Sequence, residues 1–346
     1  MTARLHSEAP AIQSSWDDLL VGIEDAGHWQ KRRETLRKRF LELIRDEAKP
    51  PPVPKDTRIE DEQIVDGSYR LRWISYQTES EDRALAAVGI PLNPTGPLPG
   101  VVALHGTTPQ GLRQTVGLEG APEEAHLDHL CRRGFAVIAP EHFVSGTRIP
   151  PEGPYDTKRF YDKHPEWTAV GKFTYEHSLA VDILSSLPEV DASRLGVMGH
   201  SLGGHGAYFL AAYDERLKAA VCNCGSTFFR HNPQVEKWAR DRWYIYFRHL
   251  RESLLRGEAP PIDMHEIIAL IAPRAFLDIS AWNDPLCHIP TQRQRALMLL
   301  KLGELYGLLE QPQNLAFYIH GQGHAVPPDS KALICEFLAQ HLKQPD

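Results

Sequence analysis

The stretch Gly199-His200-Ser201-Leu202-Gly203 lies between an apolar run, Arg194-Leu-Gly-Val-Met198, and a segment of small residues over 204–213. The first run predicts a strand and the second a helix, so Ser201 falls on the turn between them. Glycine tolerates the close approach and the unusual dihedral angles of such a turn. A G-x-S-x-G pentapeptide should arise by chance in roughly one in ten chains of this size. The pentapeptide alone is therefore weak evidence. Its position between an expected strand and an expected helix predicts a nucleophile elbow with an exposed serine hydroxyl.

Composition and charge are those of an ordinary globular protein. The chain has 346 residues, 42% hydrophobic and 24% charged, which suffices for one large α/β domain with insertions or for two ordinary domains. Its formal net charge of −7 provides no positive field for nucleic acid or an anionic membrane, so neither partner is predicted. Residues 1–10 lack the apolar run of a signal peptide and no later run reaches the length of a membrane span, which favours a cytoplasmic enzyme.

The cysteines and histidines do not predict a metal site. The five cysteines form an odd and sparse set that is typical of reduced, buried thiols: Cys131, Cys222, Cys224, Cys287 and Cys335. Cys222 and Cys224 share one face of an expected strand, and His126-Leu-Asp-His129 combines two histidines with a carboxylate. Neither group has further ligands nearby in the sequence. No metal and no organic cofactor is expected.

The chain divides into a short helical part and a long alternating part. Over residues 16–44, Trp29, Leu36 and Phe40 recur at helical spacing. The run Pro50-Pro-Pro-Val-Pro54 ends that pattern, because consecutive prolines cannot continue a helix. We therefore expect an amino-terminal helical extension over 1–56 and a catalytic α/β domain over 57–346.

Short apolar strands alternate with helical stretches through the larger part. Expected strands cover 58–65, 69–77, 84–90, 100–104, 135–139, 195–198, 219–222, 275–279 and 315–319. This alternation predicts a mostly parallel sheet with helices on both faces. Two aromatic-rich segments, 142–168 and 226–263, interrupt it after strand ends. We expect them to be lid insertions over a site, the alternative being surface segments packed on the amino-terminal helix.

A serine nucleophile needs a base, and the base needs an orienting acid. Polar residues follow the expected strands where a site of this kind should lie. Asp284 follows the strand at 275–279, and His324 follows the last strand, in a loop with two glycines. The rivals are Asp278, which lies inside its strand, and His320, which ends the last strand. The favoured triad is Ser201, Asp284 and His324.

The tetrahedral intermediate of acyl transfer requires preorganised N–H donors for its oxyanion. One donor is expected from Leu202, the residue after the nucleophile. The other is expected from Thr107, or else Gly106, in the loop after the strand at 100–104. An ordinary strand-to-helix loop is the alternative interpretation of His105-Gly106-Thr107.

At this point the chain resembles the serine hydrolases of the α/β-hydrolase superfamily, in particular the branch of dienelactone hydrolases and acetyl xylan esterases. The resemblance spans roughly residues 70–343, and its matching segments are Leu104-His-Gly-Thr107, Ala139-Pro-Glu-His142, Gly199-His-Ser-Leu-Gly-Gly204, Asn283-Asp-Pro285 and Gly323-His324. It implies an eight-stranded type of sheet and an esterase that works through an acyl-enzyme. Dienelactone hydrolases proper carry a cysteine nucleophile where Ser201 stands, which argues against dienelactone chemistry.

The expected partner is a small-molecule ester, and the amino-terminal helix could support a homo-oligomer. Candidate pocket residues are His105, Glu141, His142, His205 and Trp282, with Arg148, Tyr155 and Trp238 as further candidates. His205 lies one helical turn after Ser201 and could either face the pocket or satisfy a buried polar contact. The alternatives to an esterase are an amidase of the prolyl oligopeptidase type and a non-catalytic binding protein that kept the hydrolase shape.

Overall fold

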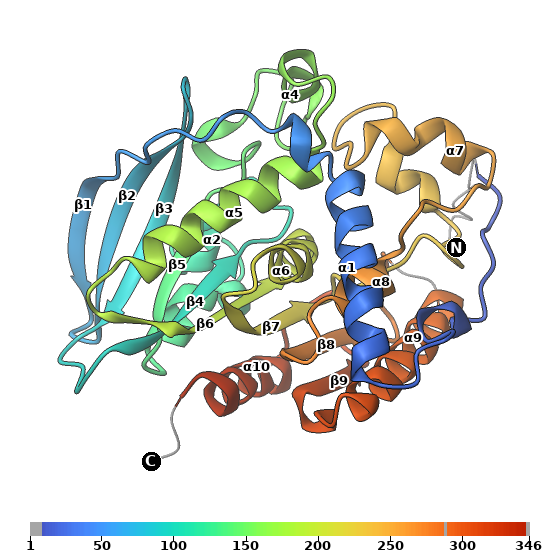
Figure 1. Ribbon diagram of the computed structural model, residues 1–346. Helices are drawn as coiled ribbons and strands as arrows, with labels where there is room; N and C mark the ends of the chain where they lie inside the picture. The colour runs from blue at the N-terminus through green and yellow to red at the C-terminus, as the bar shows by residue number, and fades with distance from the viewer. Residues whose placement is uncertain (1–8, 287–288, 344–346) are drawn as a thin grey trace.

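The computed structural model describes residues 9–286 and 289–343, which build one large sheet (Figure 1). The strands of this part are β1 (Arg58–Val65), β2 (Tyr69–Glu79), β3 (Asp82–Pro91), β4 (Leu98–Leu104), β5 (Ala136–Pro140), β6 (Val190–His200), β7 (Leu217–Asn223), β8 (Ala275–Ala281) and β9 (Leu315–His320). Their order in the sheet is β1-β2-β3-β5-β4-β6-β7-β8-β9. Strands β1, β2, β3 and β5 pair antiparallel, and the pairs from β5 through β4 to β9 are parallel.

Helices cover both faces of the sheet. They are α1 (Ala26–Leu43), α2 (Leu112–Val116), α3 (His126–Cys131), α4 (Lys158–Lys163), α5 (Ala169–Ser185), α6 (Leu202–Tyr213), α7 (Arg251–Leu255), α8 (Met264–Ala269), α9 (Ile289–Leu308) and α10 (Pro328–Leu342). Short 3-10 helices lie at Asp17–Leu19, Asp46–Ala48, Pro122–Glu124, Gly146–Arg148, Val235–Ala239, Arg248–Leu250 and Pro312–Asn314. One hydrophobic cluster joins α1, α5, α6, α8 and α9 to the sheet, and a second joins α2, α3 and α10 to its other face.

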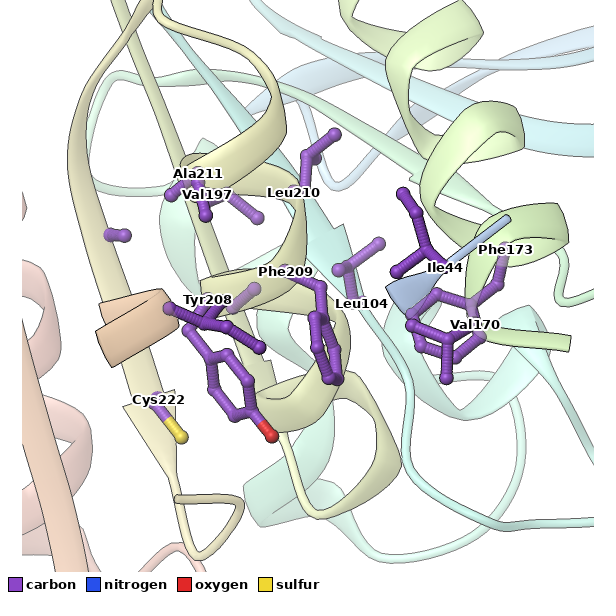
Figure 2. Packing of buried hydrophobic residues seen from close by; sticks show 14 of the residues in the cluster. Ile44, Leu104, Val170, Phe173, Val197, Tyr208, Phe209, Leu210, Ala211 and Cys222 are labelled. Carbon is purple, nitrogen blue, oxygen red and sulfur yellow. The ribbon is translucent and has the colours of Figure 1, made fainter. Parts of the chain in front are cut away.

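Helix α6 is packed in the middle of the first cluster (Figure 2). Figure 2 shows Phe209 turned toward Leu104 and toward the α5 side chains Val170 and Phe173. The rings of Phe209 and Phe173 lie edge to face, with centroids 6.0 Å apart. The helix that follows Ser201 is thus fixed on the sheet and on α5, which makes the turn before it rigid.

The sheet predicted from the alternation of strands and helices is confirmed. It has nine strands in the described part, one more than the resemblance implied, because β1 adds along the edge of β2. The amino-terminal helix begins at Ala26 rather than near residue 16. Gly22 has a φ of +71°, and the Asp25 side chain caps the helix by accepting the N–H of His28. Four of the cysteines are buried and free, and Cys287 lies outside the described residues.

The segment before α1 packs into the main hydrophobic cluster. Trp16 is 1% exposed, and its ring contacts those of Phe228 and His265 at centroid distances of 5.0 Å. The indole N–H donates to Gln294 Oε1 at 2.9 Å. The N–H of Ser14 donates to His231 Nε2, also at 2.9 Å. This segment therefore buttresses both residues 226–234 and the first turns of α9.

The two expected insertions bind one another. The N–H of Thr157 and the indole N–H of Trp243 make reciprocal hydrogen bonds across them, to Trp243 O at 3.1 Å and to Pro154 O at 2.9 Å. Tyr161 Oη adds a bond to Ile245 O at 3.0 Å. The segments 142–168 and 226–263 thus form one wall. Along the described residues, no helix combines the length and the apolar character needed to cross a bilayer.

Buried histidines make the fold sensitive to acid. Burial lowers the pKa of His105 to about 4 and the pKa values of His126 and His177 to about 3. In the unfolded chain these groups titrate near pH 6.5, so their contribution to stability is complete above pH 6.5 and is lost as pH falls toward 4. Three such groups amount to roughly 4 kcal/mol per pH unit as an upper limit.

We therefore expect the urea midpoint of unfolding, followed by circular dichroism, to fall steeply between pH 7 and pH 5. Most carboxylates still hold their charge in this range, so the slope reports the histidines. His126→Gln should reduce the slope, because it removes one of the buried histidines whose pKa is lowered. An equal free energy of unfolding at pH 7 and pH 5 would contradict the assignment.

Candidate active site

Ser201 lies on a strained turn between β6 and α6. Its backbone has φ +56° and ψ −117°, a conformation that a non-glycine residue adopts at a cost. The flanking glycines allow the turn to close. A Cβ on Gly199 would lie 2.2 Å from Gly203 O, and a Cβ on Gly203 would lie 2.2 Å from Leu104 O. These contacts are with backbone atoms, so any side chain at either position would displace the turn.

Gly203→Ala should therefore destabilise the protein and disturb its site. The new methyl group would also lie 2.8 Å from His105 O, so β4 and its following loop would have to move. We expect the free energy of unfolding to fall by about 3 kcal/mol or more, measured by urea denaturation. Gly307→Ala is the matched control, because a Cβ there meets nothing within 4 Å, and it should be neutral or stabilising. Equal unfolding midpoints for the two variants would contradict the packing argument.

A hydrogen-bonded chain joins Ser201, His324 and Asp284. Ser201 Oγ lies 2.8 Å from His324 Nε2, and His324 Nδ1 lies 2.8 Å from Asp284 Oδ2. Asp284 is 3% exposed. Burial acts to raise the pKa of Asp284, but the hydrogen bond and the charge of His324 outweigh it, so the pKa is lowered overall. The carboxylate accordingly stays ionised and orients the imidazole with Nε2 toward the serine.

The rival acid and base lie outside this chain. Asp278 is fully buried within β8, and burial raises its pKa. His320 ends β9, and its Nδ1 accepts the N–H of Gln322 at 3.1 Å. The structure thus joins Ser201, His324 and Asp284 in one hydrogen-bonded chain. The two rivals, Asp278 and His320, are not part of it.

Two asparagines hold the loops that carry the triad. Asn223, the last residue of β7, donates from its side-chain amide to His200 Nδ1 at 2.7 Å and to Ala325 O at 3.0 Å. Asn283 Oδ1 accepts the N–H of Gly323 at 2.8 Å, which ties the acid loop to the base loop. The His200 ring also packs against that of His324, with centroids 4.7 Å apart. Sequence reasoning assigned no role to Asn223, although its position at a strand end was the signal that could have identified it.

The expected oxyanion donors face the same space as Ser201. Leu202 is the first residue of α6, so its N–H points out of the helix amino terminus, and Thr107 lines the cavity beside the serine. Among the backbone hydrogen bonds of the described residues, neither amide is engaged. Tyr155 fixes the donor loop, because its Oη accepts the N–H of Thr108 at 2.9 Å and lies 3.0 Å from Gly106 O. Tyr155 is therefore a support of this loop rather than a pocket wall.

Tyr155→Phe should lower kcat more than it raises KM. Loss of the hydroxyl frees the loop that carries Thr107, so we expect a fall in kcat of about tenfold, less than complete removal of an oxyanion donor would cost. The control is Tyr306→Phe, which removes a buried hydroxyl bonded to Arg274 O at 2.8 Å, away from the serine. Both variants should lose stability in thermal unfolding, whereas only the first should lose turnover. Equal kcat values for the two variants would show that the loop carrying Thr107 does not contribute to catalysis.

A cavity of about 440 Å³ opens over Ser201 and His324. The second insertion and its neighbours supply most of the wall. Aromatic residues of the wall are Trp238, Trp243, Tyr244 and Tyr246; its cations are Lys237, Arg240 and Arg295; further polar residues are Ser226, Thr227, Asn232, Gln234 and Thr291.

The candidate pocket residues are divided between this wall and other places. His205 and Trp238 line the cavity. His105 lies beneath it, where its Nδ1–H donates to Gly106 O and its Nε2 accepts the N–H of His142 at 3.1 Å. Outside the lining are also Glu141, which accepts the N–H of Thr147; His142, whose Nε2 lies 2.9 Å from Tyr244 Oη; Arg148, paired with Glu176; and Trp282, which is 45% exposed.

One group of possible metal ligands occurs among the described residues, and it overlaps the triad. Ligand atoms of Cys224, Asp284 and His324 lie within 4.8 Å of one another. Burial raises the pKa of the Cys224 thiol to about 12, which disfavours the thiolate that a metal requires. Asp284 and His324 already bind each other, so the arrangement fits a hydrogen-bonded relay better than a metal centre.

Known proteins resemble this chain in sequence. Residues 151–292, which include Ser201 and Asp284, match the family model "Glucuronyl esterase, fungi". The chain is 26% identical to the hydrolase YtaP of Bacillus subtilis (strain 168) over 262 residues, which cover 73% of this chain and 82% of that protein. It is also 29% identical to carbohydrate esterase MZ0003, from an unknown prokaryotic organism, over 137 residues, or 35% of this chain and 30% of that one.

Solved structures share the fold. A glucuronoyl esterase from Solibacter usitatus superposes with a TM-score of 0.74 at 17% identity, covering 92% of this chain and 94% of that one. An acetyl xylan esterase from Bacteroides fragilis NCTC 9343 gives a TM-score of 0.64 at 18% identity, covering 86% and 76%. These likenesses confirm the α/β-hydrolase fold. Together with the family model and the curated relatives, they identify the chain as a serine carboxylic ester hydrolase of the α/β-hydrolase superfamily.

Proposed function

We propose that the protein hydrolyses carboxylic esters of carbohydrates through an acyl-enzyme formed on Ser201. The observation that carries this proposal is the chain of two 2.8 Å contacts from Ser201 through His324 to Asp284, placed on a strained elbow that opens into a cavity of about 440 Å³. Nucleophile and base are already within hydrogen-bond reach, as the chemistry requires.

The reaction follows from the positions of these groups. Ser201 Oγ attacks the ester carbonyl while its proton passes to His324 Nε2. The amides of Leu202 and Thr107 hold the oxyanion, and Asp284 stabilises the imidazolium. The imidazolium then returns the proton to the leaving alcohol, which leaves the acyl group on Ser201. Water, deprotonated by His324, releases the acid by the same steps in reverse order.

Two observations support a carbohydrate as part of the ester. The family-model match covers the whole second insertion, from which most of the cavity wall is built. That wall also presents the rings of Trp238 and Tyr246, with centroids 4.5 Å apart, and rigid aromatic faces offer a large contact area to the apolar face of a sugar ring. The proposal covers esters in which the carbohydrate forms the acyl part and esters in which it forms the alcohol part.

Activity-based labelling and a substrate panel test the proposal. A fluorophosphonate probe should label Ser201 in the wild-type protein, and a non-catalytic binding protein would leave it unlabelled. The panel compares methyl glucuronate, acetylated xylobiose and para-nitrophenyl acetate with para-nitroacetanilide. Faster turnover of a sugar ester than of the anilide supports the proposal. Faster cleavage of the anilide would favour the amidase alternative. Turnover of the aryl acetate alone would show an esterase whose substrate is not a carbohydrate ester.

A cytoplasmic location and a homo-oligomer remain predictions. The four buried, free cysteines among the described residues are consistent with a reducing compartment. Size-exclusion chromatography with light scattering tests the assembly, and fractionation of cells that express the full chain tests the location.

A further inference from the structure

His200, the last residue of β6, is 3% exposed and packs against the base of the triad. The centroids of the His200 and His324 rings lie 4.7 Å apart, with their planes tilted by 49°. On the side of the donor loop, a Cβ on Gly106 would lie 3.7 Å from His200 Cδ2, so the ring is enclosed there as well. The bonds of His324 to Ser201 and Asp284 act at the edge of its ring. Because the χ2 torsion of histidine is only weakly restricted, packing against a face is needed to hold the plane of that ring.

Asn223 fixes the orientation and the tautomer of the His200 ring. Its side-chain amide donates to His200 Nδ1 at 2.7 Å and to Ala325 O at 3.0 Å. A carbonyl oxygen can only accept, so Ala325 O determines which end of the Asn223 amide faces both partners. His200 Nδ1 is therefore an acceptor, and the proton of the ring lies on Nε2. The backbone carbonyl of Asn223 also accepts the N–H of Ser201 at 2.8 Å, so one residue holds the nucleophile, the His200 ring and the base loop.

The His200 ring is uncharged at neutral pH. Burial lowers the pKa of His200 well below its ordinary value, and the charges of His324 and His126 act in the same direction. Nε2, which carries the proton, lies 3.9 Å from Glu124 Oε1, and the carboxylate favours this tautomer. An uncharged neighbour suits the reaction, because His324 becomes an imidazolium when it accepts the proton of the nucleophile. A second positive charge at this distance would oppose that step.

We propose that His200 is a positioning residue of the triad: its ring, held by Asn223, fixes the plane of the His324 ring during proton transfer. The inference rests on the proposed function and deepens it, because it assigns control of the base to a residue outside the triad. His200 bonds to no reacting atom and acts through His324. Its effect is therefore expected in kcat rather than in KM.

Two substitutions separate the ring of His200 from its hydrogen bond. His200→Phe keeps an uncharged ring against His324 but removes the acceptor for Asn223, whereas His200→Asn keeps an acceptor and removes the ring. With para-nitrophenyl acetate, we expect kcat to fall by about tenfold in His200→Asn and by less than about threefold in His200→Phe, with KM unchanged in both. The rate at which a fluorophosphonate labels Ser201 should fall in parallel with kcat. Both variants lose buried interactions, so both should unfold at a lower temperature.

His265→Asn is the matched control for the loss of a buried ring. His265 is 0% exposed, and its ring lies 5.0 Å from that of Trp16, so this variant should lose stability but keep its kcat and its labelling rate. An unchanged kcat in His200→Asn overturns the inference alone. The phenylalanine variant tests it independently, because a fall in kcat of about tenfold or more in that folded protein would show that the ring does not hold the base. Absence of both ester turnover and labelling in the wild-type protein overturns the proposed function, and this inference with it.

Discussion

Ser201→Ala is expected to slow ester hydrolysis by on the order of 10⁵-fold in kcat, with KM little changed. The substitution removes the one oxygen that lies 2.8 Å from His324 Nε2, so the imidazole has no nucleophile to activate. Alanine fits the space and relieves no contact, although the φ of +56° remains unfavourable for it. The residual rate would come from water held near the oxyanion donors. Initial rates with para-nitrophenyl acetate, followed over hours, measure a loss of this size.

Ser178→Ala is a suitable control for that experiment. Ser178 lies on α5, and its Oγ donates to the local Tyr175 O at 2.7 Å, so the variant tests the handling of a serine-to-alanine change without touching the cavity. Fluorophosphonate labelling should disappear in the first variant and persist in the second. Turnover near the wild-type rate in Ser201→Ala would assign the hydrolysis to another group.

The triad could be predicted from the sequence because backbone topology constrains it. In a parallel sheet the carboxyl ends of the strands meet at one edge, so Ser201, Asp284 and His324 were expected together without any knowledge of their distances. The same rule applied to β7 would have indicated Asn223, but the expected strand stopped at residue 222, one position short. An error of one residue at a strand end was enough to miss a buried amide that holds the base loop.

The cavity wall could not be predicted in the same way. Residues 226–246 have no periodicity that fixes the direction of a side chain, and their positions depend on partners far away in the chain. Arg240 is oriented by Trp243 within its own segment, which is in turn bound to Pro154 of the first insertion. Tyr155 was expected to be a pocket wall, but it holds the donor loop through Thr108, a contact between two loops that neither sequence pattern encodes. Loops of this kind are specified by tertiary packing rather than by local propensity.

The amino-terminal segment shows the same limit. Its helical period was visible, but its role was not, because an amphipathic pattern does not say which surface it covers. Trp16 contacts Phe228 and bonds to Gln294, so the segment supports the two elements that carry Ser226 and Arg295. The sequence therefore predicted which polar groups meet at the strand ends, but not the shape of the space around them.

Asp284→Asn is expected to lower kcat by about 10⁴-fold at neutral pH while leaving the fold intact. The amide can donate to His324 Nδ1, which would stabilise the tautomer that carries its proton on Nε2, facing Ser201. That tautomer cannot accept the serine proton. The carboxylate avoids this outcome because its lowered pKa keeps it ionised, and an ionised carboxylate only accepts. The measurement is kcat against pH, and activity should recover partly in alkali, where hydroxide can replace the missing base.

Glu124→Gln is the control for the assignment of Asp284 as the acid that orients His324. Glu124 is another carboxylate near the base: its Oε1 lies 3.9 Å from His200 Nε2, and the charge of His324 acts on its pKa, which burial raises overall. It makes no direct bond to His324 among the hydrogen bonds of the described residues, so we expect its removal to cost less than about tenfold, as for a charge acting at a distance. If Glu124→Gln were as damaging as Asp284→Asn, the orienting acid would have to be shared between them. Thermal unfolding midpoints within a few degrees of the wild type, on the order of 1 kcal/mol of stability, would show that both effects arise in the chemistry rather than in the fold.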